Sequence, residues 1–439
     1  METTLQILQL FLCLPLLVVI HEFGHYFFAR LFKIRVEKFY IFFPPAVFKF
    51  KPKNSDTEFG IGCIPLGGFC KIAGMIDESM DKEALAQEPQ PWEFRSKPAW
   101  QRLLVMFGGV LFNFILAIII YSAISFTWGE SYLKNEDAKY GIEVNQLAYE
   151  IGFRNGDKLI SIDGKDAPNN FASLQYELVK TQAQQAVVLR DGKEVTIEIN
   201  KDYLPAMLNN PNMFNIAAPL VVAAIPDTSL NANSGLAIGD KLINIERKDI
   251  VFFSEMKDIL AQHKDGVVTS KVLRDKDTIT IDLNVSSEGR IEIIHQPDFS
   301  AFNITNKEYS LLAAIGAGAK KSVTTLSNYL QELKLIFSPK TEAYKSVGSF
   351  ITIVNLFPGK WDWRIFWNLT GWLSIMLAVI NILPIPALDG GHIIFTLYEM
   401  ITGKKPSDKF LGYAQALGMI LLLMLTFLAF GNDIFRLFN

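Results

Sequence analysis

The hydrophobic residues of this chain are gathered in four long runs. Each run is long enough, or nearly so, to cross a bilayer as a helix. The runs are Leu5–Leu31, Leu103–Trp128, Ile365–Leu388 and Leu411–Phe430. The segment between the second and third runs, Gly129–Pro358, is polar and has the composition of a soluble domain. The pattern predicts a polytopic α-helical membrane protein with about four transmembrane helices and a large extramembrane insert.

The first apolar run carries three ionisable side chains in the pattern His21-Glu22-Phe23-Gly24-His25. On a helix, His21 and His25 are one turn apart on the same face, so both imidazoles reach one metal ion. Glu22 projects beside that metal, where a carboxylate takes a proton from a bound water. Core histidines satisfied by backbone carbonyls are the alternative, but such side chains are costly at membrane depth unless they face a cavity or a metal. The H-E-x-x-H spacing therefore predicts a zinc site in the first helix.

The third apolar run ends in NILPIPALDGGH, from Asn381 to His392. Its prolines and glycines break the helix, and Asp389 is an ionisable residue at membrane depth, which marks it as a site candidate. A zinc held by two histidines lacks a third protein ligand, and a catalytic site leaves the fourth position to water. We predict that Asp389 is that third ligand, with one zinc per chain. The alternatives are that Asp389 only caps a helix and that His392 is a ligand rather than a support.

The segment Glu58–Gly74 (EFGIGCIPLGGFCKIAG) contains two short apolar stretches separated by Pro65-Leu66-Gly67-Gly68. It predicts two strands joined by a turn at those four residues. The segment is too short to span and too apolar for an ordinary loop, so we expect a hairpin that dips into the membrane. An uncovered edge of such a hairpin could pair with an extended substrate. An ordinary soluble hairpin is the alternative.

Positive charge predicts the orientation in the membrane. Arg30 to Lys53 holds seven lysines and arginines against one acid, and Lys404, Lys405 and Lys409 lie between the last two runs. Both connections are therefore expected on the cytoplasmic side. Both termini and the insert then lie on the other side, which is the periplasm in a bacterial cell, and the metal lies toward the cytoplasmic leaflet. The apolar N-terminal run is expected to be a span rather than a signal peptide.

The insert contains an internal repeat. Gly152–Asp163 recurs as Gly235–Glu246, and Val188–Asp191 recurs as Val272–Asp275. Two copies of one small domain are predicted, at residues 130–205 and 206–290. The shared G-x-x-x-G-D pattern resembles PDZ domains, which are α+β folds that bind extended peptides by strand addition. The alternative is that the two copies only pack together or filter by size.

The remaining chain divides by composition. Residues 1–129 form a membrane part with spans at about 5–31 and 103–128 and the hairpin at 58–74. Residues 291–364 are amphipathic and are expected on the outer membrane surface, and residues 365–439 hold the last two spans, at about 365–388 and 411–430. The net charge of -3 gives no nucleic-acid footprint. The three cysteines, Cys13, Cys63 and Cys70, match no zinc spacing and no disulfide framework.

With HEFGH in the first run, NILPIPALDGG in the third and the PDZ-like pair between the second and third, the chain resembles the site-2 protease family. The resemblance implies that His21, His25 and Asp389 bind zinc and that Glu22 is the catalytic base. It also implies that Asn381 contacts substrate and that residues 60–72 form a membrane-re-entrant β-loop. Within that loop, the expected substrate contacts are Gly60, Ile61, Gly62, Gly67 and Gly68. Val110 departs from the family pattern, which often has a proline there.

The family's activity is regulated intramembrane proteolysis. The resemblance implies cleavage of single-span proteins already trimmed on the periplasmic side, such as an anti-sigma factor, and of remnant signal peptides. It places the protein in a bacterial inner membrane, with the lipid bilayer and transmembrane proteins as partners and no nucleic acid. A catalytically silent, membrane-anchored PDZ scaffold is the alternative. A transporter usually has more spans and a repeat of its helices, whereas only the insert repeats here.

Overall fold

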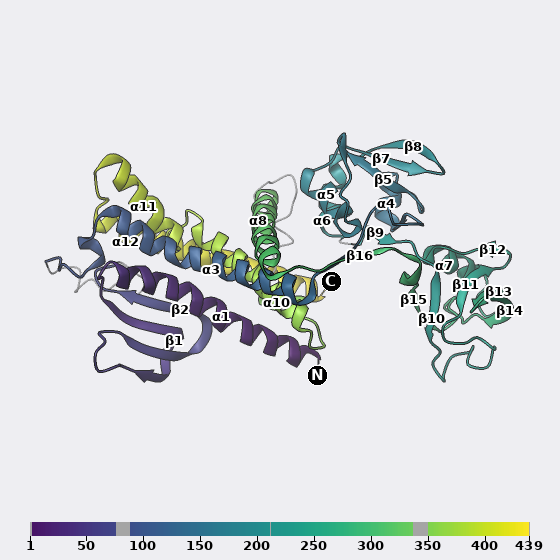
Figure 1. The fold of residues 1–439 in the computed structure, drawn as a ribbon, viewed down its shortest axis with the longest axis horizontal. Coiled ribbons are helices and arrows are strands. Elements are labelled where there is room, and N and C mark those ends of the chain that lie inside the picture. Colours follow the sequence, from purple (N-terminus) through teal and green to yellow (C-terminus); the bar gives the residue numbers. More distant parts are fainter. Residues whose placement is uncertain (1, 76–87, 211, 337–349, 439) are drawn as a thin grey trace. The chain divides into compact units, whose positions relative to one another are not determined.

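Four long apolar helices form the membrane part of the protein (Figure 1). The computed structural model describes residues 2–75, 88–210, 212–336 and 350–438 and divides into two units, Met1–Gly129 with Glu308–Asn439, and Glu130–Lys307. Four helices in the described ranges are long and apolar enough to cross a membrane. They are α1 (Glu2–Leu31), α3 (Ala99–Trp128), α10 (Trp363–Ile382) and α12 (Asp408–Phe438). The prediction of a polytopic membrane protein is confirmed.

The third of these helices is shorter than the sequence predicted. α10 begins where the Asp362 carboxylate accepts a hydrogen bond from the backbone N–H of Ile365 at 2.9 Å. It ends at Ile382 rather than at residue 388, because the prolines at 384 and 386 have no N–H to continue the helix. The chain turns there and starts a separate helix, α11 (Asp389–Thr402), which ends at Gly403 with a φ of 68°.

The first two spanning helices touch backbone to backbone. Gly24 of α1 and Gly108 of α3 lie at the crossing, and a Cβ on either would overlap the carbonyl oxygen of the other. Small residues let membrane helices approach this closely. One apolar core lies at each end of α1, the first around Ala29, Val105, Met106 and Ile393, the second around Leu10, Leu17, Phe366 and Leu373. The crossing therefore fixes the C-terminal third of α1 against the N-terminal third of α3.

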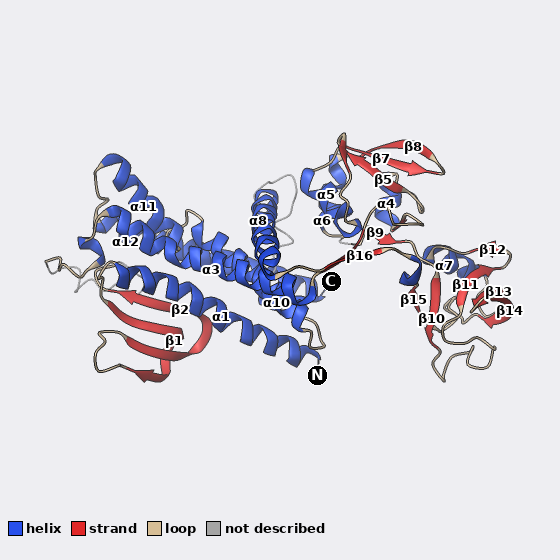
Figure 2. Ribbon diagram, viewed as in Figure 1, coloured by secondary structure: helices blue, strands red, loops and turns tan. Residues whose placement is uncertain are grey.

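Two long strands, β1 (Val36–Phe50) and β2 (Glu58–Ile72), pair antiparallel in a sheet beside α1 (Figure 2). Tyr40 of β1 pairs with Phe69 on one side and with Gly60 on the other, and Gly60 also pairs with Lys49. The predicted direct hairpin within Glu58–Gly74 is therefore wrong. β2 runs on through residues 65–68, and its two apolar stretches lie on opposite sides of residues 38–41 of β1. The cysteines at 63 and 70 are both free.

Two further helices belong to the membrane unit, α8 (Leu311–Ile336) and α9 (Phe350–Leu356). α8 packs on α3, where a Cβ at Gly318 would overlap Ser122, and Tyr329 joins a core with Tyr121 and Ile120. The predicted place of residues 291–364 on the outer membrane surface stays a prediction. Residues 337–349 of that region lie outside the described residues.

The other unit consists of two lobes, each with its own core. In the first lobe the sheet order is β6-β5-β7-β8, and in the second it is β12-β11-β13-β14 with β10 and β15 beyond β11. The first lobe holds β4 (Ile142–Val144), α4 (Gln146–Ile151), β5 (Lys158–Ile162), β6 (Lys165–Asp166), α5 (Leu174–Thr181), β7 (Gln185–Arg190), β8 (Lys193–Glu198), α6 (Leu204–Leu208) and β9 (Phe214–Ile216). The second holds β10 (Leu220–Ala224), β11 (Lys241–Ile245), β12 (Lys248–Asp249), α7 (Phe253–Gln262), β13 (Val267–Arg274), β14 (Asp277–Asn284) and β15 (Ile294–Pro297).

Each lobe contains the same ion pair between a buried aspartate and a partly exposed arginine. Asp157 accepts hydrogen bonds from the Arg190 guanidinium at 2.7 and 2.8 Å, and Asp240 accepts two from Arg274, both at 2.7 Å. Each carboxylate also accepts a backbone N–H, from residue 154 at 2.8 Å and from residue 237 at 2.9 Å. The aspartates thereby close the turn before β5 and β11 and tie it to the end of β7 and β13.

The two ends of this unit are paired with each other. β3 (Glu130–Leu133) and β16 (Ile304–Lys307) form an antiparallel two-stranded ladder, in which Glu130 faces Lys307 and Leu133 faces Ile304. The chain therefore enters and leaves the unit along one pair of strands.

Candidate metal centre

The two histidines of the first helix face each other in space. His21 and His25 are one turn apart on α1, and their Nε2 atoms are 3.3 Å apart. Both side chains are buried, at 8% and 6% exposed. The helical spacing of four residues produces this arrangement, as the sequence predicted.

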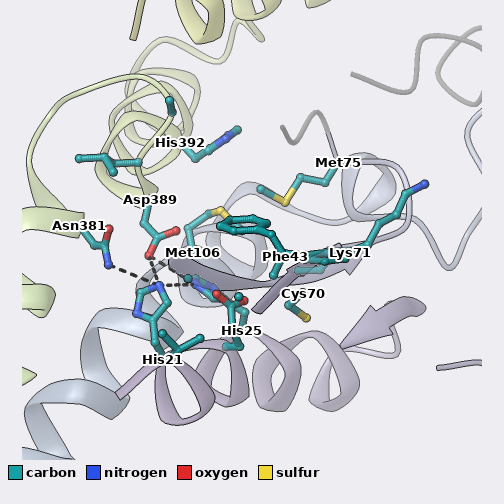
Figure 3. Close-up of a pocket in the computed structure, with 18 of the residues that line it drawn as sticks. His21, His25, Phe43, Cys70, Lys71, Met75, Met106, Asn381, Asp389 and His392 are labelled. Carbon is teal, nitrogen blue, oxygen red and sulfur yellow. Dashed lines mark hydrogen bonds and ion pairs between the residues drawn. The ribbon is translucent and has the colours of Figure 1, made fainter. Parts of the chain in front are cut away.

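Asp389, the first residue of α11, completes the group (Figure 3). Its Oδ2 lies 3.3 Å from Nε2 of His21 and 3.4 Å from Nε2 of His25. The three atoms form a nearly equilateral triangle. Around a tetrahedral zinc with bonds of about 2.0–2.2 Å, neighbouring ligand atoms are about 3.4 Å apart. The buried Oδ2 accepts no hydrogen bond from any described residue. The donor set, its spacing and the unsatisfied oxygen all fit a zinc ion.

The outer ring nitrogens of both histidines have partners. Nδ1 of His25 lies 2.9 Å from the backbone carbonyl of Val105, so it must carry a proton, and its Nε2 keeps a lone pair for a metal. Nδ1 of His21 lies 3.2 Å from the side-chain amide of Asn113, which is fully buried. The amide oxygen of Asn113 has no hydrogen-bond partner among the residues that the structure describes. If the amide is turned by 180°, its oxygen accepts the Nδ1 proton of His21, and both the oxygen and the N–H then have a hydrogen-bond partner. The Nε2 of His21 then keeps its lone pair for the candidate metal position.

Glycine leaves room for both rings. A Cβ on Gly109 of α3 would overlap Nε2 of His25 and Cε1 of His21. The family pattern often has a proline at the next position, where this chain has Val110. In the structure, α3 continues through Val110 as a helix. The close approach therefore depends on Gly109 and needs no bend at residue 110.

Glu22 lies beside the three candidate ligands in one cavity of about 490 Å³. The backbone of Cys70 in β2 faces its carboxylate, and both residues line the cavity. The strand therefore borders the carboxylate on one side of the cavity. The other walls come from β1, β2, α3, α10, α11 and α12, and include Phe43, Lys71, Met75, Met106, His392 and Gln415.

The structure brings some of the predicted substrate contacts to this cavity. Gly67, Gly68 and Asn381 line it, and the Asn381 amide lies 3.5 Å from Nε2 of His21. Residues 60–62 do not line it. They lie in β2 against β1, where Cβ atoms at Gly60 and Gly62 would overlap the Tyr40 ring and the backbone of residue 43.

Two residues of this site were not given a role from the sequence. They are Asn113 in the second span and Gln415 in the last span. A polar side chain within an apolar run is the signal that could have found Gln415, because such residues face interior partners. His392 lines the cavity but stands outside the triangle of ligand atoms.

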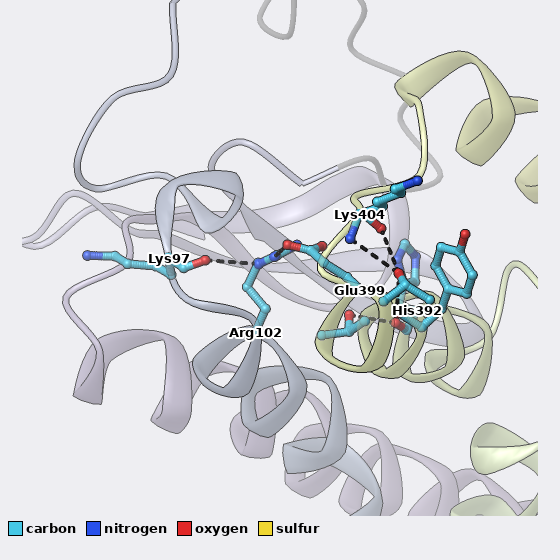
Figure 4. A network of polar contacts seen from close by, with 8 residues as sticks. Lys97, Arg102, His392, Glu399 and Lys404 are labelled. Atoms are coloured by element: carbon cyan, nitrogen blue, oxygen red, sulfur yellow. Dashed lines mark hydrogen bonds and ion pairs between the residues drawn. The ribbon is translucent and has the colours of Figure 1, made fainter.

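A polar network ties the helix of Asp389 to α3 (Figure 4). The Arg102 guanidinium donates to the carbonyl of Lys97 at 3.0 Å and to the carboxylate of Glu399 at 2.5 Å. On α11 itself, the Thr396 hydroxyl donates to the carbonyl of His392 at 2.7 Å. The ion pair holds the far part of α11 against the helix that also carries Asn113.

Comparison with known proteins gives matches along nearly the whole chain. The sequence model of peptidase family M50 matches residues 9–425, which include all four predicted zinc and base residues. Relatives named "putative zinc metalloprotease" occur in several bacteria. The one from Neisseria meningitidis serogroup A is 26% identical over 444 residues, 96% of this chain and 97% of the relative. Those from Thermotoga maritima and Borreliella burgdorferi are 25% and 27% identical, covering 97% and 98% of this chain and 99% and 98% of the relatives.

Proposed function

This chain belongs to peptidase family M50, the site-2 protease family, and from that membership and the geometry of the site we propose that it is an intramembrane zinc endopeptidase. In this proposal His21, His25 and Asp389 hold one zinc ion per chain, and Glu22 is the catalytic base. The observation that carries it is the triangle of ligand atoms at 3.3–3.4 Å, with Glu22 in the same cavity.

The chemistry follows from the residues around the cavity. When bound, zinc polarises a water molecule and the scissile carbonyl. The Glu22 carboxylate accepts a proton from the water and passes it to the leaving amine. The backbone N–H of Cys70 faces that carboxylate and can orient it. Asn381, which lies next to His21, has an amide that can hydrogen-bond the substrate backbone.

The substrate backbone is expected to pair with β2. A transmembrane helix resists hydrolysis because its carbonyls are already hydrogen-bonded, so it must first unwind. On one side β2 pairs with β1, and on the other the N–H of Cys70 points to Glu22. Strand residues two apart point the same way, so Gly68 directs its backbone groups to the same cavity. An extended substrate could add to this edge beside the metal.

The substrate class and the topology rest on the family resemblance. We propose cleavage of single-span proteins already trimmed on the periplasmic side, including an anti-sigma factor and remnant signal peptides, in regulated intramembrane proteolysis. The two lobes share their strand order and their Asp–Arg pair, which supports two PDZ-like domains that bind peptide or act as a size filter. The basic segments around residues 30–53 and 404–409 support cytoplasmic placement of these connections in an inner membrane.

The test is cleavage of a model single-span substrate in liposomes, with zinc measured on the same preparation. We expect wild type to hold one zinc and to cleave. Glu22→Gln should keep the zinc and lose activity by about 10²–10⁴-fold, the range for a lost general base. Glu194→Gln, at an exposed position of β8 in the other unit, is the matched control and should cleave normally.

The outcomes separate the proposal from its alternative. Robust cleavage by Glu22→Gln would remove Glu22 from the mechanism. A wild-type protein with neither zinc nor cleavage would favour the silent, membrane-anchored PDZ scaffold.

A further inference from the structure

The last spanning helix contacts the loop that leads into Asp389. Oε1 of Gln415, on α12, accepts a hydrogen bond from the backbone N–H of Ala387 at 3.1 Å. Gln415 is only 6% exposed and lies in the wall of the metal cavity. A glutamine at this depth is costly without an interior partner, and its partner here is a loop backbone two residues before a candidate metal ligand.

The loop is strained at the residue that Gln415 holds. Ala387 has a φ of 86°, in the left-handed region that a side chain with a Cβ rarely adopts. Such a conformation persists only where the surroundings hold it. Because Ala387 is two residues from Asp389, relaxation of its φ would redirect the chain that presents the Asp389 carboxylate.

One turn further along, α12 also contacts the backbone of the loop. A Cβ at Gly418 of α12 would overlap the carbonyl oxygen of Pro386. From the other side, Cβ atoms at Gly390 and Gly391 of α11 would overlap the backbone of residues 382–386. The loop is therefore clamped between α11 and α12, and neither helix has room for a methyl group at the contact.

We propose that Gln415 and Gly418 are positioning residues for Asp389: α12 holds the loop 383–388 in the strained form that completes the metal site. This inference rests on the proposed function, because it assumes that Asp389 is a metal ligand. It adds that the last helix, which supplies none of the predicted ligands, sets the affinity of the site.

The experiment measures zinc retention by the full-length protein in detergent against a competing chelator. Gln415→Leu removes the acceptor at similar volume and should retain zinc about tenfold less well, the low end for loss of an outer-shell partner. The visible spectrum of the Co²⁺-loaded protein should change with it, which a general loss of stability would not cause. Gln415→Glu keeps an acceptor oxygen and should retain zinc better than Gln415→Leu.

A double variant tests the strain directly. Glycine adopts a positive φ freely, so Ala387→Gly should reduce the need for Gln415. The double variant Ala387→Gly with Gln415→Leu should then regain most of the lost zinc retention. Gly418→Ala should weaken retention, whereas Gly412→Ala on the same helix should not, because a Cβ there meets nothing within 4 Å.

Equal zinc retention by wild type and Gln415→Leu would overturn the inference and leave the proposed function standing. A wild-type protein that binds no zinc would overturn both.

Discussion

Buried aspartates in the two units of this protein have opposite surroundings. In the second lobe, Asp240 is 1% exposed and accepts two hydrogen bonds from Arg274 and one from a backbone N–H. In the membrane unit, the buried Oδ2 of Asp389 accepts none from the described residues, and the Nε2 atoms of His21 and His25 lie 3.3 and 3.4 Å from it.

The difference separates a structural carboxylate from a functional one. Burying a charged group is costly unless it is paired and hydrogen-bonded. Asp240 meets that condition within the chain, so its role is complete in the folded protein. Asp389 lacks its partner, and the histidines next to it offer further lone pairs rather than protons. Under the proposed function, the partner of Asp389 is the zinc ion, and the carboxylate is maintained to bind it.

The largest predicted effect comes from neutralising each aspartate in turn. Asp389→Asn should abolish zinc binding and cleavage, and it should leave the stability of the zinc-free protein unchanged or raised, because a neutral amide is cheaper to bury. Asp240→Asn should keep zinc and destabilise the second lobe by about 2 kcal/mol through loss of charged hydrogen bonds. Zinc content and hydrogen exchange of β11 and β13 peptides in the full-length protein measure both.

The exposed Asp227 supplies the control for this pair, and Asp227→Asn should change neither quantity. Destabilisation of the zinc-free protein by Asp389→Asn would show that Asp389 has a structural partner after all.

A smaller effect on zinc affinity is expected from substitutions at Asn113, whose buried amide contacts a candidate ligand but is not one itself. If its oxygen accepts the Nδ1 proton of His21, Asn113→Asp keeps that acceptor and should retain zinc nearly as wild type. Asn113→Leu should lower zinc affinity by about tenfold or more, as for other outer-shell partners. Chelator competition on the two variants measures this, and equal affinities would mean that the tautomer of His21 is set in another way.

The smallest predicted effect concerns how the stability of the second lobe depends on pH. The Arg274 guanidinium holds the pKa of Asp240 below its usual range, and hydrogen bonds from Lys241 and Ser300 do the same for the pKa of Asp298. A carboxyl with a lowered folded-state pKa adds stability above its unfolded pKa of about 3.9, and this is lost as the pH falls through the folded value. The urea midpoint of the lobe should therefore fall as the pH drops below about 5.

Urea titrations at each pH, followed by a brief hydrogen-exchange pulse at one fixed pH, give that midpoint. Asp240→Asn should show a shallower fall than wild type, and an identical fall would assign the pH dependence to other groups.

The sequence predicted the parts of the molecule that depend on local spacing. Four apolar runs gave four spanning helices, and the His21–His25 spacing placed two imidazoles on one helix face. Asp389 was also found locally, as an acid in an apolar run. The sheet was predicted wrongly because its partner strand, around Tyr40, lies in a segment whose lysines suggested only a loop. Strand register depends on tertiary pairing, which no window of sequence contains.

The sequence predicted the three candidate ligands, which the structure brings together, but not the residues that contact them or the loop before Asp389. Asn113 and Gln415 act through contacts 92 and 28 residues away in the chain. Each is the single amide of its apolar run, Leu103–Trp128 for Asn113 and Leu411–Phe430 for Gln415. Their contacts depend on which helices cross. The crossing of α1 and α3 in turn requires Gly24 and Gly108, because a side chain at either position would overlap the other helix.

The paired strands β3 and β16 bring the two ends of the two-lobed unit together, so that this unit, here called the cassette, could be exchanged as one piece. Because Glu130 and Lys307 face each other across one ladder, residues 130–307 are attached to the rest of the chain at what is mechanically a single point. A twist or pull on the cassette loads the segments after α3 and before α8 together. For an engineer, the same feature marks a graft junction: a foreign domain with adjacent termini could replace the cassette without lengthening either connection.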